Sequence, residues 1–195
     1  LEISKSLPKN TGTVIVKHAN PCGVSIHKNN LKSYESALAC DPISAFGGIV
    51  SCNYKITKSI AIELNKIFLE VIIANGFDKN SLRILKSKKN VRLIDASNYS
   101  LNEIIRSSSI NGSMLVQSQD RQIFSKKNFK FVSKKKPNKL QLDNLLFAFN
   151  ICRYVKSNAI VLANNKSTIG IGSGQPSRLD SCEIAINKMN KFIKT

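Results

Sequence analysis

A short β-branched run followed directly by a cation and an imidazole sets the strongest limit on how this chain can fold. Residues 13–16 read Thr-Val-Ile-Val, which is typical of a buried strand, and Lys17 and His18 come directly after them. Pro21 and Gly23 follow, and we expect these two residues to turn the chain. In open α/β sheets, ligands bind beyond the carboxyl ends of the strands. The segment therefore predicts an α/β fold in which Lys17 and His18 face a crevice at one edge of the sheet.

Strand-like and helix-like stretches alternate along the rest of the chain, as they do in α/β proteins. Apolar periodicity and capping residues predict helices over residues 32–40, 57–69 and 142–155 and from Ser181 onward. β-branched and apolar runs predict strands over residues 44–51, 70–74, 91–94, 112–117, 159–163 and 168–172, the first of them entered through a glycine-rich turn. We expect a polar connection at residues 107–109 and a basic linker ending at Lys139, so that the chain divides into two α/β halves.

Two of the expected helices carry an apolar face that should lie against the sheet. The face of the first helix is formed by Ile60, Ile62, Leu64, Ile67 and Phe68. The face of the second helix is formed by Leu142, Leu145, Leu146, Phe149, Cys152 and Val155. Because an apolar stripe of this kind is stable only when it is covered, we expect these residues to contribute to the core.

The basic balance of the chain admits three interpretations. The 195 residues carry a formal net charge of +18, and the basic residues gather between positions 83 and 139. No aromatic side chains are interleaved with them at stacking intervals, which argues against a nucleic-acid partner. We favour a solvated surface, with a field that attracts an anionic substrate as the second interpretation and nucleic-acid binding as the third.

Cysteine usage and hydropathy indicate the compartment. The five cysteines are scattered and show no C-x-x-C spacing, which argues against a disulfide framework and against a structural zinc site. No apolar run is long enough to cross a bilayer. We therefore expect a cytoplasmic protein without a membrane partner. Because the first residues contain neither an initiator Met nor an apolar signal core, we expect the chain to begin inside a longer protein.

Four segments could carry chemistry, and each also has a purely structural interpretation. Lys17 and His18 could form a strand-end salt bridge and a cap, or they could act as an electrostatic stabiliser and a base, since a nearby cation favours the neutral imidazole. The Phe-Gly-Gly sequence at 46–48 could be a bulged turn, or it could let a ring or a phosphate approach the backbone. Glu70 could be a surface carboxylate, or it could accept hydrogen bonds from substrate amino or hydroxyl groups.

The fourth segment is the glycine-rich stretch at residues 170–174, and it resembles a nucleotide-binding loop only weakly. No Lys-Ser or Lys-Thr pair follows it, and the dinucleotide fingerprint spacing is not met. Arg178 nearby could still contact a phosphate or a carboxylate. A zinc-deaminase signature is incomplete as well, because Asn20 and Ser25 stand where that chemistry needs a Glu and a second Cys. We therefore expect no metal.

Five longer motifs occur in order along the chain. They are Lys-His-Ala-Asn-Pro-Cys-Gly at 17–23, Asp-Pro-Ile-Ser-Ala-Phe-Gly-Gly at 41–48, Glu-Val-Ile-Ile-Ala at 70–74, Val-Lys-Ser-Asn-Ala-Ile at 155–160 and Gly-Ile-Gly-Ser-Gly-Gln-Pro-Ser-Arg at 170–178. Together they make the chain similar, over about residues 13–188, to the transformylase portion of the bifunctional AICAR transformylase/IMP cyclohydrolase family.

The resemblance implies an enzyme, phosphoribosylaminoimidazolecarboxamide formyltransferase. In de novo purine synthesis this activity moves a formyl group from 10-formyltetrahydrofolate to the 5-amino group of the aminoimidazole carboxamide ribonucleotide (AICAR). The resemblance implies that His18 takes the proton from the attacking amine and that Lys17 stabilises the developing oxyanion. It also implies that the nucleotide is contacted by Asn20, Phe46, Gly47, Glu70, Asn158 and Arg178. Leu179 would contribute to the folate site.

The family's fold is a pair of cytidine-deaminase-like, three-layer α/β subdomains without the zinc, and its active site forms across a homodimer. We expect residues 1–130 to form a complete first subdomain, residues 131–139 a basic linker, and residues 140–195 the start of a truncated second one. The N-terminal cyclohydrolase domain and the C-terminal part of the transformylase are absent, so we expect a fragment that is inactive alone. An inactive nucleotide-binding remnant and a basic nucleic-acid-binding module stay open as alternatives.

Overall fold

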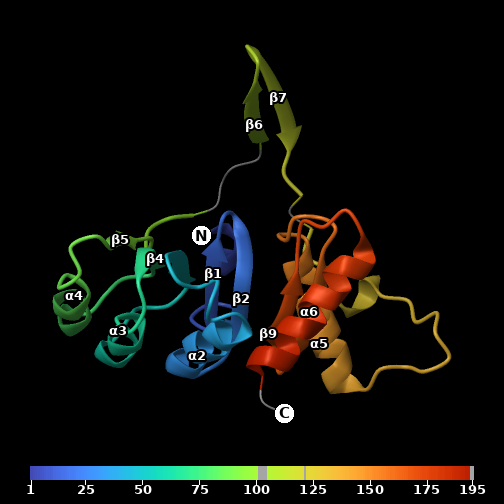
Figure 1. The fold of residues 1–195 in the computed structure, drawn as a ribbon, viewed down its shortest axis with the longest axis horizontal. Coiled ribbons are helices and arrows are strands. Elements are labelled where there is room, and N and C mark those ends of the chain that lie inside the picture. The colour runs from blue at the N-terminus through green and yellow to red at the C-terminus, as the bar shows by residue number, and fades with distance from the viewer. Residues whose placement is uncertain (101–104, 121, 194–195) are drawn as a thin grey trace.

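The fold is built on a seven-stranded sheet with helices packed against it (Figure 1). The computed structural model describes residues 1–100, 105–120 and 122–193. The strands of the sheet are β1 (Gly12–Lys17), β2 (Asn20–Ile26), β3 (Gly48–Cys52), β4 (Leu69–Ala74), β5 (Arg92–Asp95), β8 (Ile160–Asn164) and β9 (Ser167–Gly172). The helices are α1 (Glu2–Ser6), α2 (Asn30–Cys40), α3 (Lys58–Leu64), α4 (Lys79–Leu85), α5 (Lys139–Cys152) and α6 (Arg178–Phe192), with a 3-10 turn at Lys126–Asn128.

The sheet is mixed and runs in the order β5-β4-β3-β1-β2-β9-β8. β3, β4 and β5 are parallel to one another, whereas β1 is antiparallel to both β2 and β3, and β9 is antiparallel to both β2 and β8. The predicted α/β class is therefore confirmed. β2 pairs with β9 through Ser25 and Ser167, so one sheet runs through both predicted halves. The division into two cytidine-deaminase-like subdomains at residues 131–139 stays a prediction.

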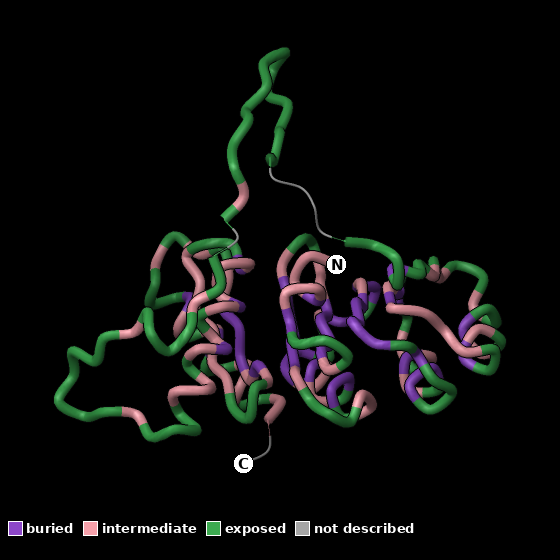
Figure 2. The backbone as a smooth tube through the Cα atoms, turned by 180° about the vertical axis from the view of Figure 1, so that it is seen from behind, coloured by how far each residue is buried: buried purple, intermediate pink, exposed green. Residues whose placement is uncertain are grey.

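Strand β1 is covered on both faces, as its β-branched sequence predicts. Ile15 packs into the larger core cluster together with Tyr34 of α2 and Val50 of β3. Its neighbour Val14 points the other way and packs into a second cluster with Ile151 of α5. The buried residues accordingly concentrate along the strands and the inner sides of the helices (Figure 2). None of the helices within the described ranges is long and apolar enough to cross a membrane.

The turn after β1 lies earlier than predicted. His18 and Ala19 form a tight turn in which both residues have positive φ, 49° and 64°, and Lys17 pairs with Asn20. Pro21 and Gly23 are therefore not turn residues but lie inside β2. β2 pairs with β9 only at Ser25, so the start of β2 has no neighbouring strand on the β9 side. A proline is tolerated there, because it has no N–H to donate to such a neighbour.

The predicted polar connection at residues 107–109 is a strand instead. β6 (Ile105–Ile110) and β7 (Ser113–Ser118) form an exposed hairpin that projects from the body of the molecule (Figure 1). Asn111 and Gly112 turn the chain with φ of 43° and 77°, which is the geometry that an Asn-Gly pair favours. The serines belong to a strand because the residues across the ladder, from Met114 to Val116, hold them in register.

Three helix predictions need correction. The first amphipathic helix ends at Leu64, so Ile67 and Phe68 lie beyond it, and Ile62 is exposed. Helix α5 leaves Leu145 and Phe149 of the predicted face exposed, and it buries Phe147 and Ile151, which were not predicted. The remaining members of that face are half-buried or, in the case of Val155 just beyond the helix, buried. Phe147 and Ile151 are buried because they pack into the cluster that contains Val14 of β1 and Val24 of β2. The last helix begins at Arg178 rather than at Ser181, because Ser177 serves as its N-cap.

Candidate functional site

The predicted site residues gather at one edge of the sheet. β1 ends at this edge, and its antiparallel neighbours β2 and β3 begin there, as does β4, which is parallel to β3. β9 runs antiparallel to β2 and therefore ends at the same edge, where the chain enters α6. The residues that this topology brings to the edge are Lys17, His18, Asn20, Phe46, Gly47, Glu70, Asn158, Arg178 and Leu179.

Lys17 is held by the turn that precedes β3. Its Nζ donates a hydrogen bond of 2.8 Å to the carbonyl oxygen of Gly47, and the Gly47 N–H donates to the carbonyl of Phe68 at 2.8 Å. Gly47 has a φ of +64°, and a Cβ at this position would lie 2.9 Å from the Lys17 Nζ. The positive φ therefore favours glycine, and a larger residue would in addition displace the end of the Lys17 side chain. No carboxylate of the described residues pairs with Lys17, so the strand-end salt bridge is not formed.

His18 stands exposed at the tip of the β1–β2 turn. Its imidazole makes no hydrogen bond or ion pair with any residue that the structure describes, and it caps no helix. The ring nitrogens are therefore free to exchange a proton with a bound molecule. Neither the salt bridge nor the cap of the structural interpretation is formed among the described residues, and the catalytic roles of Lys17 and His18 stay predictions.

Two aromatic rings lie beside Lys17. Phe46 is 63% exposed and Phe68 is 37% exposed, and their ring centroids are 5.6 Å apart at an interplanar angle of 53°. Exposed rings of this kind offer an apolar surface on which a flat heterocycle can stack. The sequence placed Phe68 on a helix face, so its position here was missed. The signal that could have revealed it is its place two residues before Glu70, at the start of β4.

Glu70 projects from a bulge at the start of β4. Leu69 and Val71 pair with the consecutive residues Gly48 and Ile49, so Glu70 is the extra residue in the ladder. Its carboxylate lines a pocket of 470 Å³ together with Phe68, Lys89, Asn90, Val91 and Arg92. Lys89 and Arg92 belong to the basic stretch that we interpreted as a solvated surface. They therefore share a pocket with Glu70, a predicted nucleotide contact.

The two predicted asparagines connect the two sides of the site. The Asn20 Oδ1 accepts a hydrogen bond of 2.9 Å from the backbone N–H of Lys156. The Asn158 Nδ2 donates to the carbonyl oxygens of Gln175 at 3.0 Å and Pro176 at 2.7 Å. These bonds tie the start of β2 to the segment before β8, and that segment to the loop after β9.

The glycines of the 170–174 stretch serve packing in part. Gly170 and Gly172 lie inside β9, and a Cβ on Gly172 would come within 1.8 Å of the backbone oxygen of Ser181. Helix α6 therefore approaches β9 more closely than any other residue would allow. Arg178 and Leu179 occupy the exposed first turn of this helix, where Ser177 Oγ accepts a hydrogen bond from the Leu179 N–H.

Buried thiols near the site are held in their neutral form. Burial, with a smaller contribution from the neighbouring Asp41 carboxylate, raises the pKa of Cys22 to about 12, and burial raises the pKa of Cys40 to about 11. A thiol in this state is a poor nucleophile and a poor metal ligand. Within the described ranges no three His, Cys, Asp or Glu residues cluster as they would around a metal ion.

Comparison with known proteins gives a consistent result. Residues 1–188 match the AICARFT/IMPCHase bienzyme family. The bifunctional purine biosynthesis protein PurH of Persephonella marina is 45% identical over 184 residues, which cover 93% of this chain and 35% of the relative. The PurH of Leptospira biflexa is 42% identical over 191 residues, which cover 97% of this chain and 37% of the relative. The chain thus spans about a third of the length of the curated relatives that it matches.

Proposed function

The chain belongs to the AICARFT/IMPCHase bienzyme family, and we propose that it carries the transformylase chemistry of that family. The proposed reaction transfers the formyl group of 10-formyltetrahydrofolate to the 5-amino group of AICAR during purine synthesis. The observation that supports this proposal most strongly is the contact between the Lys17 ammonium and the Gly47 carbonyl, at the residue that precedes the exposed His18 in the chain. This arrangement supplies a fixed positive charge and a base at adjacent positions.

The proposed mechanism uses both groups. The amine of AICAR is a weak nucleophile because its lone pair is delocalised into the imidazole ring. His18 accepts a proton from this amine as the nitrogen bonds to the formyl carbon, and Lys17 donates a hydrogen bond to the oxygen that becomes negative. The bond from that carbon to N10 of the folate then breaks, N10 takes up a proton, and tetrahydrofolate leaves. Holding both substrates together supplies much of the rate.

Nucleotide binding is proposed for the residues around this pair. The exposed ring of Phe46 would cover one face of the base, and Glu70 would accept hydrogen bonds from amino or hydroxyl groups. Arg178 would contact the phosphate, since a guanidinium can donate two parallel hydrogen bonds. Asn20 and Asn158 already bind backbone groups, so we propose that they shape the nucleotide pocket while they contact it.

We further propose that the folate lies against Leu179 and that the site is completed across a homodimer. Leu179 is exposed at the start of α6, and His18 is open to solvent. The β6–β7 hairpin exposes several large apolar side chains, namely Ile105, Ile110, Met114, Leu115 and Val116. A two-stranded hairpin is marginally stable by itself in water, so a second copy that covers it would stabilise it. The five free cysteines support a reducing cytoplasm as the compartment.

The test combines calorimetry with a formyl-transfer assay. We expect this chain to bind AICAR saturably and to bind no RNA oligomer. We expect formation of tetrahydrofolate, when both substrates are present, in a full-length enzyme that contains these residues. Lys17→Ala and His18→Ala should keep the nucleotide affinity within about twofold and lose turnover by at least about 100-fold, the usual contribution of acid–base catalysis. Binding without turnover in the unmodified full-length enzyme would favour the inactive remnant. Binding of RNA alone, with a steep salt dependence, would favour the basic module.

A further inference from the structure

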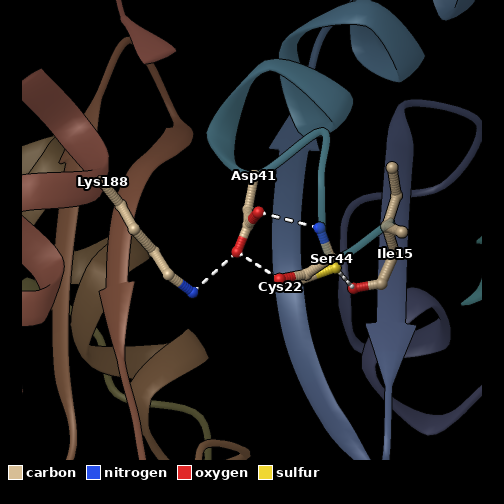
Figure 3. A network of polar contacts seen from close by, with 5 residues as sticks. All are labelled: Ile15, Cys22, Asp41, Ser44 and Lys188. Atoms are coloured by element: carbon tan, nitrogen blue, oxygen red, sulfur yellow. Dashed lines mark hydrogen bonds and ion pairs between the residues drawn. The ribbon is translucent and has the colours of Figure 1, made fainter. Parts of the chain in front are cut away.

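An ion pair between Asp41 and Lys188 links the end of α2 to helix α6. Asp41 directly follows α2, and its side chain is 3% exposed. Lys188, from α6, places its Nζ 2.6 Å from the Asp41 Oδ2 (Figure 3). Figure 3 shows the lysine reaching across from α6 to the carboxylate, which lies between that helix and the strand that carries Cys22. A charge buried to this extent is stable only with partners, so Asp41 depends on its contacts.

Asp41 also organises the turn that leads to the site. Its Oδ1 accepts a hydrogen bond of 2.9 Å from the Ser44 N–H, and its Oδ2 accepts one of 2.7 Å from the Ser44 hydroxyl. Its backbone carbonyl accepts from the Ala45 N–H at 3.2 Å, and the Ala45 carbonyl accepts from the Gly48 N–H at 3.0 Å. The carboxylate therefore fixes the first half of the turn that presents Phe46 and Gly47.

Short contacts continue from this turn to the predicted catalytic lysine. Gly47 accepts the hydrogen bond from Lys17 Nζ, and its N–H is bound to Phe68. On the other side, Lys188 lies on the helix whose first turn carries Arg178 and Leu179. One carboxylate thus contacts both the turn that holds Lys17 and the helix that presents Arg178.

We propose that Asp41 is a positioning residue for the candidate site. Its carboxylate, held by Lys188, sets the Phe46–Gly47 turn and with it the place of the Lys17 ammonium relative to the first turn of α6. Hydrogen bonds from Lys188 and Ser44 outweigh burial and keep the pKa of Asp41 below its usual range, so the carboxylate stays charged in this role. The consequence for nucleotide binding rests on the proposed function, whereas the consequence for the turn does not.

Amide hydrogen exchange tests the turn directly. In Asp41→Asn, which keeps the size of the side chain, the amides of Gly47 and Gly48 should exchange at least about tenfold faster, while the amide of Ile72 in the core strand β4 keeps its protection. Asp143→Asn is the matched control. Asp143 lies in α5, away from the site, and its Oδ1 is 2.9 Å from the Nζ of Lys126, so this variant also removes an ion pair. Unchanged exchange at Gly47 and Gly48 in a folded Asp41→Asn chain would overturn the proposal.

Lys188→Gln covers the case in which Asp41→Asn does not fold. This variant keeps the Ser44 contacts of Asp41, so we expect a smaller but measurable acceleration of exchange at the same two glycines. If Lys188→Gln leaves their exchange unchanged, the proposal is overturned even when the asparagine variant is unfolded.

Calorimetry with AICAR then separates this inference from the proposed function. Asp41→Asn should weaken nucleotide binding at least about fivefold, and Asp143→Asn should leave it unchanged. An unmodified chain that binds no nucleotide contradicts the proposed function, while the exchange result still decides the role of Asp41. Equal affinities in the unmodified chain and in Asp41→Asn, together with a lower melting temperature in the variant, would show that Asp41 serves stability alone.

Discussion

Replacing Gly47 with alanine should separate the backbone requirement at this turn from its contact with Lys17. Gly47 has a φ of +64°, and a left-handed conformation costs an alanine about 1–2 kcal/mol. The new Cβ would also lie 2.9 Å from Lys17 Nζ, so the ammonium must move and lose its hydrogen bond to the Gly47 carbonyl. Because Lys17 is partly exposed, that loss adds about 1 kcal/mol. We expect a total loss of about 2–3 kcal/mol in the free energy of unfolding.

Urea denaturation of two pairs of variants measures the two contributions. Gly76→Ala is the backbone control, because Gly76 has a φ of +98° and a Cβ there would meet only Lys55 Cγ at 3.7 Å. It should lose about 1–2 kcal/mol. In a Lys17→Met background, Gly47→Ala should cost only the same backbone amount, since the hydrogen bond is already absent. Equal losses for Gly47→Ala with and without Lys17 would show that the contact between Lys17 and Gly47 contributes nothing to stability.

Two further predictions concern the packing of α6. Below about pH 4 the free energy of unfolding should fall more steeply for the unmodified chain than for Asp41→Asn. Hydrogen bonds hold the pKa of Asp41 in the folded state below its usual 3.8. The stabilisation that Asp41 contributes is therefore present above pH 3.8 and is lost as the pH falls through the folded-state pKa. Parallel plots of the free energy of unfolding against pH for the two proteins would contradict this. Gly172→Ala should cost about 3 kcal/mol or more, because its Cβ would lie 1.8 Å from the Ser181 oxygen. Gly174→Ala should cost only about 1–2 kcal/mol for its φ of +69°, because its Cβ meets nothing within 4 Å. Equal melting temperatures of the two variants would argue against the tight approach of α6.

Local sequence patterns predicted most strands of the sheet. The β-branched run before Lys17, the run after Glu70 and the two runs around residue 165 all form strands close to their predicted bounds. These strands are covered on their apolar sides, so their sequence pattern reflects their environment directly. Helix limits were less accurate, because caps such as Ser177 and the position of neighbouring strands decide where a helix ends and which side it buries.

The tight turn at His18 and Ala19 was not predictable from residue type. Both residues adopt positive φ although neither is glycine, and Pro21 and Gly23 nearby are the stronger turn signals. The Asn111–Gly112 pair, in contrast, was a readable signal for the β6–β7 hairpin, since this dipeptide favours a two-residue hairpin turn.

Long motifs located the candidate site, but its contacts depend on the order of the strands. Lys17 reaches Gly47 because β1 and β3 are neighbours, and Phe68 joins them because β4 lies next to β3. The pair of Asp41 and Lys188 joins elements that only the packing of α6 on β9 brings together. No local pattern in the sequence encodes such pairs.

We propose that AICAR binds at the sheet edge beside Lys17 and Gly47. The most direct measurement is a titration of the isotopically labelled chain with AICAR, followed by the backbone amide resonances. We expect saturable shifts of the amide resonances of Gly47, Glu70 and Asn158, with those of α4 unchanged. A folded chain whose shifts are confined to the basic stretch between residues 126 and 139, or whose resonances do not respond to AICAR, would contradict it.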